Sequence, residues 1–293
     1  MKVSVLIPTY RRKLHLLHTL FCFENQTVLP HEIIIIDASE EEYVLTSADL
    51  KTFTNNINYI HWPEIGNVSK QRNEAIRRST GDIILFVDDD VDFNKAFVES
   101  HINIYNAMKV DAISGVVENS YHSFGAPPAN KFSKLLDPHG PNLQPCNCIE
   151  ATHVICTANF SVKRKVLFSV GGFDENIYGV MDDVEFGVRL VKKGYCCIHH
   201  PLPKVYHFMA SSSGARTPAL GPEWNLSNMI YFQLKHFYKN KKRKLFYNLL
   251  YDFYKPSGNW LRPMKLVKLF GTILRAYKNA EMRFEEGEKL LVD

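Results

Sequence analysis

The chain has 293 residues, of which 45% are apolar and 23% are charged, and its formal net charge at pH 7 is +4. This composition is that of an ordinary globular protein and excludes a disordered or low-complexity chain. No apolar run reaches the roughly 18 residues of a membrane-spanning helix, and the N-terminus lacks a signal-peptide core, so we expect a cytoplasmic protein. The six cysteines lack the spacing of a zinc site and predict reduced thiols.

Apolar strands alternate with amphipathic helices over the first ninety residues. We expect strands at residues 3–7, 32–37, 58–61 and 83–87, and helices at 14–23 and 66–76. Pro8 should end the first strand because proline has no N–H to donate, and Ser69 is the expected cap of the second helix. This alternation predicts an α/β fold with a mostly parallel, doubly wound sheet.

Three consecutive acids, Asp88, Asp89 and Asp90, follow the most apolar strand. Open α/β sheets bind their ligands beyond the carboxyl ends of the strands. Adjacent carboxylates repel one another, and a hard divalent cation shared with phosphate oxygens relieves that repulsion. On these residues alone, a metal–phosphate site and a solvated acidic turn are equal alternatives.

Other polar residues should lie near the same edge of the sheet. Asp37 ends the second strand, and Lys70 and Arg72 fall near the N-terminus of a helix, where the dipole favours phosphate.

Four segments in order resemble the family-2 glycosyltransferases of the GT-A fold. They are Ser-Val-Leu-Ile-Pro-Thr-Tyr at 4–10, Ile-Ile-Asp-Ala-Ser at 35–39, Gly-Asn-Val-Ser-Lys-Gln-Arg-Asn at 66–73 and Phe-Val-Asp-Asp-Asp-Val at 86–91. The resemblance implies a Rossmann-like central sheet flanked by helices, with a C-terminal helical extension. It also implies metal-dependent, inverting transfer of a sugar from a UDP-, dTDP- or GDP-linked donor to a glycan or lipid-linked acceptor. The chain resembles bacterial rhamnosyltransferases in particular, and the resemblance implies a role in cell-surface polysaccharide or lipopolysaccharide synthesis.

The resemblance also assigns roles to residues of the first half. Asp37 binds the nucleotide base, and the loop of Pro8, Thr9 and Tyr10 lies along the nucleoside. The acids map onto the family's Asp-x-Asp motif, with Asp88 and Asp89 near the ribose and Asp90 on Mg²⁺ or Mn²⁺. The family's usual Asp-Asn/Gly-Ser is Asp-Ala-Ser here, which leaves the base undetermined.

The second half contains a long segment at 118–147, rich in Pro, Gly, Asn and His. A loop of this length is either functional or disordered, and we weigh a substrate-facing insertion and a surface loop equally. In the resemblance, Asn159 lies in a small-residue loop that faces the donor sugar.

A second acidic pair, Asp182 and Asp183, begins an amphipathic helix at 181–190. Acids are favoured at a helix N-terminus, so capping would explain one of them. The resemblance instead matches the family's Glu-Asp motif, with Asp182 in place of the Glu and Asp183 as general base. Glycosyl transfer to an alcohol needs such a base, together with a cation for the leaving diphosphate.

Two residues further along the chain are phosphate or metal candidates. His207 ends a Val-Tyr-His segment that in many family members supplies a metal ligand or a phosphate contact. Arg216, in a loop at 211–216, is a candidate contact for the diphosphate.

The C-terminal segment is basic and aromatic. Residues 239–278 carry eleven Lys or Arg against one acid, and helices are expected at 224–237, 245–254 and 264–277. Such helices suit an anionic membrane surface, so we expect a peripheral protein on the inner face of the membrane. The alternative is that these helices pack on the catalytic domain. No nucleic-acid-binding module accompanies the charge, so no nucleic-acid partner is expected.

We therefore divide the chain into a GT-A domain at 1–222 and a helical extension at 223–293. Within the first, residues 1–117 bind the nucleotide sugar and 118–222 form the acceptor and catalytic half. Two other functions stay open. One is a haloacid-dehalogenase-type phosphatase with Asp88 as nucleophile, and the other is a non-catalytic nucleotide-sugar binder.

Overall fold

The structure, a computed structural model, describes residues 1–118, 123–124, 149–152, 154–177, 179, 181–208, 222–238, 240, 242 and 263–291. Its strands are β1 (Val3–Thr9), β2 (Glu32–Asp37), β3 (Ile57–His61), β4 (Ile83–Phe86), β5 (Val91–Phe93), β6 (Ala112–Glu118), β7 (Ser123–Phe124), β8 (Glu150–Ala151), β9 (Phe160–Lys163) and β10 (Cys197–His207). Its α-helices are α1 (Lys13–Glu24), α2 (Ser47–Leu50), α3 (Val68–Arg78), α4 (Phe97–Ala107), α5 (Arg164–Val170), α6 (Asp182–Lys192), α7 (Pro222–His236) and α9 (Pro263–Glu286). Short 3₁₀ turns are η1 (Glu41–Tyr43), η2 (Pro63–Ile65) and η4 (Thr157–Asn159).

The strands form a single mixed sheet in the order β3-β2-β1-β4-β9-β6-β10-β5, with β7 beside β6 and β8 beside β10. The first four strands of this order are parallel, as the βα alternation predicted. Beyond β4 the directions mix, because β9 lies antiparallel between β4 and β6, and β10 runs parallel to β6 but antiparallel to β5. The α/β fold is therefore confirmed, with a parallel half and a mixed half.

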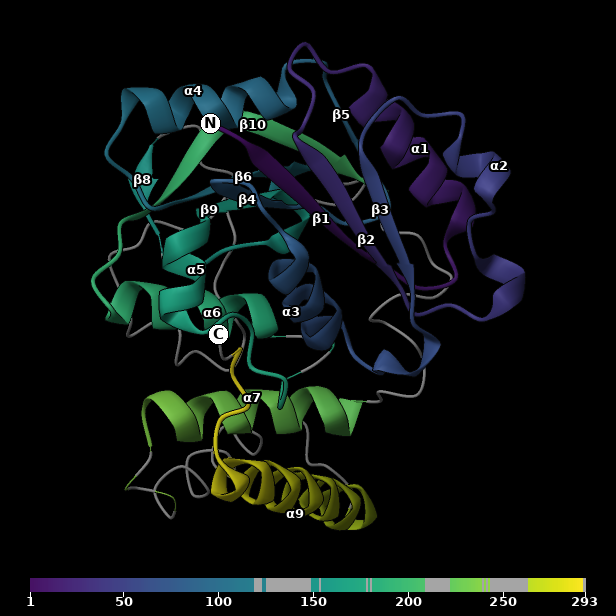
Figure 1. Cartoon of the computed structure of the whole chain (residues 1–293). Helices are drawn as coiled ribbons and strands as arrows, with labels where there is room; N and C mark the ends of the chain where they lie inside the picture. The colour runs from purple at the N-terminus through teal and green to yellow at the C-terminus, as the bar shows by residue number, and fades with distance from the viewer. Residues whose placement is uncertain are drawn as a thin grey trace.

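Helices cover both faces of the sheet (Figure 1). Residues 5, 7, 33 and 35 of the parallel strands pack toward α1 and α4, and residues 6, 34 and 36 pack toward α3, α5 and α6. Since both faces are buried, these strands need apolar residues at every position rather than at alternate ones. This explains the uninterrupted runs of isoleucine and leucine in the sequence.

Two local predictions were wrong. Pro8 lies inside β1, paired with Ile36, because its nitrogen faces the β4 side beyond the last β1–β4 pair, Leu6 and Phe86, where no ladder donor is needed. Helix α3 is capped by Asn67, whose side chain accepts the Lys70 N–H at 2.8 Å. Ser69 lies inside the helix and donates its hydroxyl to a carbonyl of the 173–177 segment.

Helices α7 and α9 lie together below α3 and α6 in Figure 1 and bury their apolar faces. The shared cluster contains Ile177, Ile230, Tyr231, Leu234, Ala276, Tyr277 and Ala280. The described parts of the C-terminal helices therefore pack against protein, which was the alternative to a membrane surface. The helix predicted at 245–254 lies outside the described residues. Within the described part of the chain, no helix is long and apolar enough to cross a membrane.

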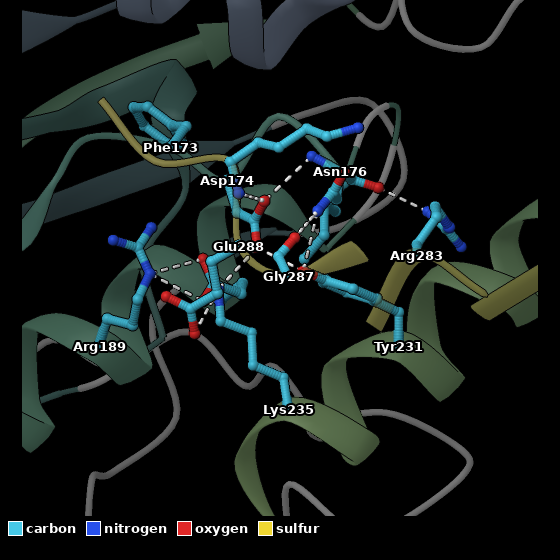
Figure 2. A network of polar contacts seen from close by, with 12 residues as sticks. Phe173, Asp174, Asn176, Arg189, Tyr231, Lys235, Arg283, Gly287 and Glu288 are labelled. Atoms are coloured by element: carbon cyan, nitrogen blue, oxygen red, sulfur yellow. Dashed lines mark hydrogen bonds and ion pairs between the residues drawn. The ribbon is translucent and has the colours of Figure 1, made fainter. Parts of the chain in front are cut away.

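Buried charges also join these helices to the sheet domain (Figure 2). Asp174 accepts hydrogen bonds from the Tyr231 hydroxyl at 2.8 Å and from Lys235 Nζ at 2.7 Å. Lys235 also pairs with Glu185 of α6 at 2.8 Å. Burial alone would raise the pKa of Glu185, but Arg189, His236 and Lys235 together hold it well below its usual range. The C-terminal helices are thus tied to the helix that begins with Asp182 and Asp183.

Candidate active site

The carboxyl ends of β1 and β2 bring Thr9 and Asp37 to one edge of the sheet, directly opposite each other in register. Asp37 is buried, and its carboxylate accepts the Ser39 N–H at 2.8 Å and the hydroxyl of Tyr59. Gln71 of α3 donates to the carbonyls of Thr9 and Ile36 at 3.0 and 3.1 Å, which fixes the two strand ends. Two residues assigned to the nucleoside by the resemblance therefore lie side by side.

The three acids after β4 form a turn held from the first helix. Arg12 Nη1 lies 3.0 Å from Asp89 Oδ1 and 3.1 Å from Asp90 Oδ2. Thr9 donates to the other Asp89 oxygen at 2.6 Å. Burial raises the pKa of Asp89 to about 7, with the Arg12 charge opposing the shift and Asp90 adding to it. The Thr19 hydroxyl also donates to the carbonyls of Asp89 and Val91, at 2.9 and 3.1 Å, which ties the turn to α1.

One ligand atom each from Asp88, Asp90 and His207 lies within 4.8 Å of the other two. His207 Nε2 is 2.8 Å from Asp90 Oδ1 and 3.7 Å from Asp88 Oδ2. The antiparallel β5–β10 ladder sets His207 opposite Val91, next to the acids. Two carboxylates and one imidazole suit Mn²⁺ or Mg²⁺. The sequence assigned Asp90 and His207 to this ion and Asp88 to the ribose, and the structure places all three together.

Arg72 connects this cluster to the second acidic pair. Its guanidinium is buried, forms an ion pair with Asp182, and donates to the Thr157 hydroxyl at 2.8 Å. The same group lies 3.9 Å from Asp88 Oδ1, and its Cζ is 5.3 Å from the centroid of the Phe173 ring. The Arg72 guanidinium therefore pairs with one acid of each group, Asp88 and Asp182.

Asp183 lies in the first turn of α6 and is half-buried. Neither it nor Asp182 caps the helix, because Met181 occupies the N-cap position with a left-handed φ of 75° and no side-chain cap bond forms. Burial raises the pKa of Asp183 to about 7, and the charge of Asp182 adds to this shift while Arg72 opposes it. A carboxylate with a pKa near the working pH is well matched to general-base catalysis.

The Asn159 side chain, expected to face the donor sugar, is bonded to other parts of the protein. This residue is fully buried, and its amide donates to the Val116 and Pro203 carbonyls at 2.9 and 3.0 Å. The β6–β10 ladder is interrupted between His199 and Lys204, and the Asn159 amide fills the gap that this leaves. Its Oδ1 also contacts His101 Nε2 at 3.1 Å, so Asn159 has a structural role.

Three other candidates lie around the site in different settings. Tyr10 and Pro8 are half-buried, and the Tyr10 hydroxyl lies 3.3 Å from Glu40. Lys70 is exposed in the first turn of α3. Arg216 lies outside the described residues, as does most of the predicted insertion at 118–147.

Two residues with site contacts were not predicted. Arg12 holds Asp89 and Asp90, and Thr157 holds Arg72. The position of Arg12 just after the Pro-Thr-Tyr loop was a signal, but nothing local pairs it with acids 77 residues away. Thr157 carries no sequence signal of its own.

The fold and the site together indicate a class of protein. It is an α/β protein with a carboxylate-rich candidate cation site at the carboxyl ends of its parallel strands. The sequence profile described as glycosyl transferase family 2 matches residues 4–168, which is more than half of the chain. The chain therefore belongs to glycosyl transferase family 2, as the four segments predicted. Asp182, Asp183 and His207 lie beyond the matched residues.

Curated relatives carry related names. The glycosyltransferase AglE of Haloferax volcanii is 25% identical over 196 residues, which cover 66% of this chain and 62% of AglE. A Mycobacterium tuberculosis N-acetylglucosaminyl-diphospho-decaprenol L-rhamnosyltransferase is 43% identical over 58 residues, 20% of this chain and 19% of that protein. The matched parts thus span less than two thirds of these relatives' own lengths.

Two solved structures share the fold. S. aureus TarS 1-349 in complex with UDP-GlcNAc has a TM-score of 0.65 at 15% identity, covering 96% of this chain and 81% of TarS. The mannosyltransferase PcManGT from Pyrobaculum calidifontis, in complex with GDP-Man and Mn²⁺, has a TM-score of 0.55 at 16% identity, covering 97% of this chain and 74% of that one. These likenesses confirm the GT-A-like architecture.

Proposed function

We propose that this chain is a divalent-metal-dependent, inverting glycosyltransferase that uses a nucleotide diphosphate sugar. The observation that carries the proposal is the position of Arg72, which lies 3.9 Å from Asp88 and forms an ion pair with Asp182. Arg72 thus links the candidate cation site to Asp182, the neighbour of Asp183, and burial raises the pKa of Asp183 toward the range that suits a general base. The nucleotide sugars in the TarS and PcManGT complexes and the Mn²⁺ of PcManGT support the choice of donor and ion.

The nucleotide part of the donor is bound by residues at the ends of β1 and β2 and at the start of α3. Asp37, Thr9, Pro8 and Tyr10 bind the nucleoside, with the Asp37 carboxylate toward the base. Lys70, exposed in the first turn of α3, contacts phosphate oxygens, where the helix dipole also favours them. Asp89, held by Arg12 and Thr9, keeps the acidic turn in place beside the ribose.

Asp88, Asp90 and His207 would hold Mg²⁺ or Mn²⁺, and the ion would supply positive charge for the leaving diphosphate. Asp183 takes the proton of the acceptor hydroxyl as the oxygen attacks the anomeric carbon from the side opposite the diphosphate. One displacement of this kind inverts the anomeric configuration. Asp182 holds Arg72 in place, and the Arg72 charge opposes the rise in the pKa of Asp183.

The acceptor we propose is a hydroxyl of a glycan or lipid-linked glycan in cell-surface polysaccharide or lipopolysaccharide synthesis. The name of the mycobacterial rhamnosyltransferase, whose substrate is a diphospho-decaprenol, supports a lipid-linked acceptor. Arg216 remains a proposed diphosphate contact.

Contact with an anionic membrane surface is a separate proposal. The apolar faces of α7 and α9 are buried against each other, so the lysine-rich run at 239–244 is the segment that would bind lipid. Flotation with anionic vesicles tests this. Binding that charge reversal of Lys241, Arg243 and Lys244 abolishes would support it, and equal recovery of both proteins with the vesicles would reject it.

The test of the function is calorimetric titration with UDP, GDP and dTDP, with and without Mn²⁺, on wild type and Asp90→Ala. We expect one nucleotide to bind in a Mn²⁺-dependent manner, and Asp90→Ala to lose that dependence. His31 is exposed and lies just before β2, at the end far from Asp37. His31→Ala therefore serves as a matched control and should bind as wild type does. Binding of none of the three nucleotides would reject the proposal.

Family membership excludes one of the two alternative functions, and the other stays open. A haloacid-dehalogenase-type phosphatase is excluded, since the chain belongs to another family. A non-catalytic nucleotide-sugar binder would pass the calorimetric test but would show no transfer, and Asp183→Asn would change nothing measurable.

A further inference from the structure

A second group of metal-ligand side chains lies between α1 and β5. His18 and Cys22 are one helical turn apart, and Asp92 reaches them from β5. Cys22 Sγ is 3.7 Å from His18 Nε2 and 3.4 Å from Asp92 Oδ1, and His18 Nε2 is 3.9 Å from Asp92 Oδ2. None of these residues belongs to the candidate active site.

These separations match those of ligands around a tetrahedral ion. With Zn–S near 2.3 Å and Zn–N or Zn–O near 2.0–2.1 Å, tetrahedral angles place the donor atoms about 3.3–3.6 Å apart. The three distances here differ from that range by a few tenths of an ångström or less. Small rotations of side chains would therefore close the site around one ion.

The arrangement differs from a nucleophile–base–acid relay. In a relay, the thiol and the carboxylate contact different nitrogens of the imidazole ring. Here both the sulfur and a carboxylate oxygen approach the same nitrogen, Nε2 of His18. All three groups therefore point at one spot, as ligands of a shared ion do.

Exposure leaves this spot open to an ion from solution. The side chains of His18 and Asp92 are 44% and 51% exposed, and Cys22 lies beneath them. The His18 ring meets the Phe208 ring edge to face, with 5.4 Å between centroids, which restricts its orientation. The fourth position of a tetrahedral ion would face water.

We propose that His18, Cys22 and Asp92 bind a zinc-type divalent cation. A thiolate and an imidazole favour Zn²⁺, whereas the carboxylate-rich cluster of Asp88, Asp90 and His207 favours Mg²⁺ or Mn²⁺. The two sites are neighbours along the chain, because Asp92 follows Asp90 by two residues and Phe208 follows His207. The bound ion clamps α1 to β5, the strand that follows the acidic turn. This site does not depend on the proposed transfer reaction.

The full chain, freed of metal by a chelator that is then removed, is titrated with Zn²⁺ in competition with a chromophoric zinc indicator. Wild type should bind one Zn²⁺ that excess Mn²⁺ does not displace. His18→Ala should weaken that binding by at least about 100-fold, since even changes to outer-shell partners cost about 10- to 100-fold. Cys196→Ser, at an exposed cysteine elsewhere, and Asp90→Ala should both keep the ion.

Cobalt substitution identifies the ligands directly. Co²⁺ bound to wild type should show thiolate-to-metal charge-transfer absorption, which Cys22→Ser should lose. Since Cys22 is largely buried, the exposed variants His18→Ala and Asp92→Asn decide the question if Cys22→Ser does not fold. Unchanged Zn²⁺ affinity in these two variants, or a wild-type cobalt complex without the thiolate band, would overturn the proposal.

Discussion

Arg72 of α3 and Asp182 of α6 form a buried ion pair between residues 110 positions apart in the sequence. Each is nine-tenths buried or more, and Arg72 also lies near Asp88. One guanidinium thus balances charge in both acidic constellations, and its loss would affect the stability and the electrostatics of the site together.

Arg72→Ala should leave Asp182 buried without its counter-ion and cost about 3–5 kcal/mol of unfolding free energy. Arg77→Ala, at an exposed position of the same helix, should cost about 0–1 kcal/mol. Urea unfolding measures both. Adding Asp182→Asn to Arg72→Ala removes the unpaired charge and should restore part of the loss. Similar costs for Arg72→Ala and Arg77→Ala would contradict a buried role for this pair.

Much of the candidate site was predictable because its residues belong to short ordered motifs. Thr9, Asp37, Asp90 and His207 came from segments that also fix the ends of strands. The contacts of Arg12 and the structural role of Asn159 were not predictable. They depend on which strands become neighbours and where a ladder is interrupted, and local sequence does not determine either.

Asp183→Asn should lower kcat by about 10²–10⁴, because an amide cannot take the proton of the acceptor hydroxyl. Nucleotide affinity should stay unchanged, since the nucleoside residues lie on β1 and β2. Transfer assays and calorimetry on the same preparation separate the two effects. Asp82→Asn, an exposed acid before β4, should keep full activity. A full rate with Asp183→Asn would remove it from the mechanism.

Activity should fall with pH below the Asp183 pKa, which burial and Asp182 raise to about 7 in the metal-free protein. A bound cation favours the ionised form and moves this acid limb lower. The sign for stability is opposite to that of a paired carboxylate. Because the folded state holds this proton more tightly than the unfolded chain, the residue's contribution to the unfolding free energy falls as pH rises from about 4 to about 7.

The pH dependence of urea unfolding, compared between wild type and Asp183→Asn, checks this sign. As pH rises across this range, the unfolding free energy of wild type should fall relative to that of the variant. An unchanged difference between them would show that the Asp183 pKa is not raised.

His207→Ala should weaken Mn²⁺ binding by at least about tenfold, because it removes one of three candidate ligands. Calorimetric titration of Mn²⁺ into the variant measures the change. The exposed His31→Ala again gives the matched comparison. Equal Mn²⁺ affinity in His207→Ala and wild type would assign the ion to the carboxylates alone.

The C-terminal helices show what composition alone leaves open about a surface. Interleaved aromatic and basic residues at 224–237 and 264–277 suggested helices lying on lipid. In the structure, Tyr231, Ile230 and Ala276 pack in a shared cluster. Lys235 forms ion pairs with the buried acids Asp174 and Glu185. The sequence pattern marks an apolar face but does not say whether protein or lipid covers it.

Lys235→Ala should be among the most destabilising single changes in this network. Its Nζ pairs with Asp174 at 2.7 Å and Glu185 at 2.8 Å, and both carboxylates are fully buried. Removing the ammonium leaves them without that partner, and we expect a loss of about 3–5 kcal/mol. Arg275→Ala breaks a pair with Glu223 whose side chains are 62% and 43% exposed, and should cost about 0–1 kcal/mol.

Urea unfolding followed by tryptophan fluorescence and by circular dichroism gives both values. If α7 and α9 unfold together with the sheet domain, the two signals should coincide in wild type, and Lys235→Ala should move both to lower urea. A variant in which only one signal shifts would show that the C-terminal helices unfold as a separate unit, and equal costs for Lys235→Ala and Arg275→Ala would show that burial adds nothing to this contact.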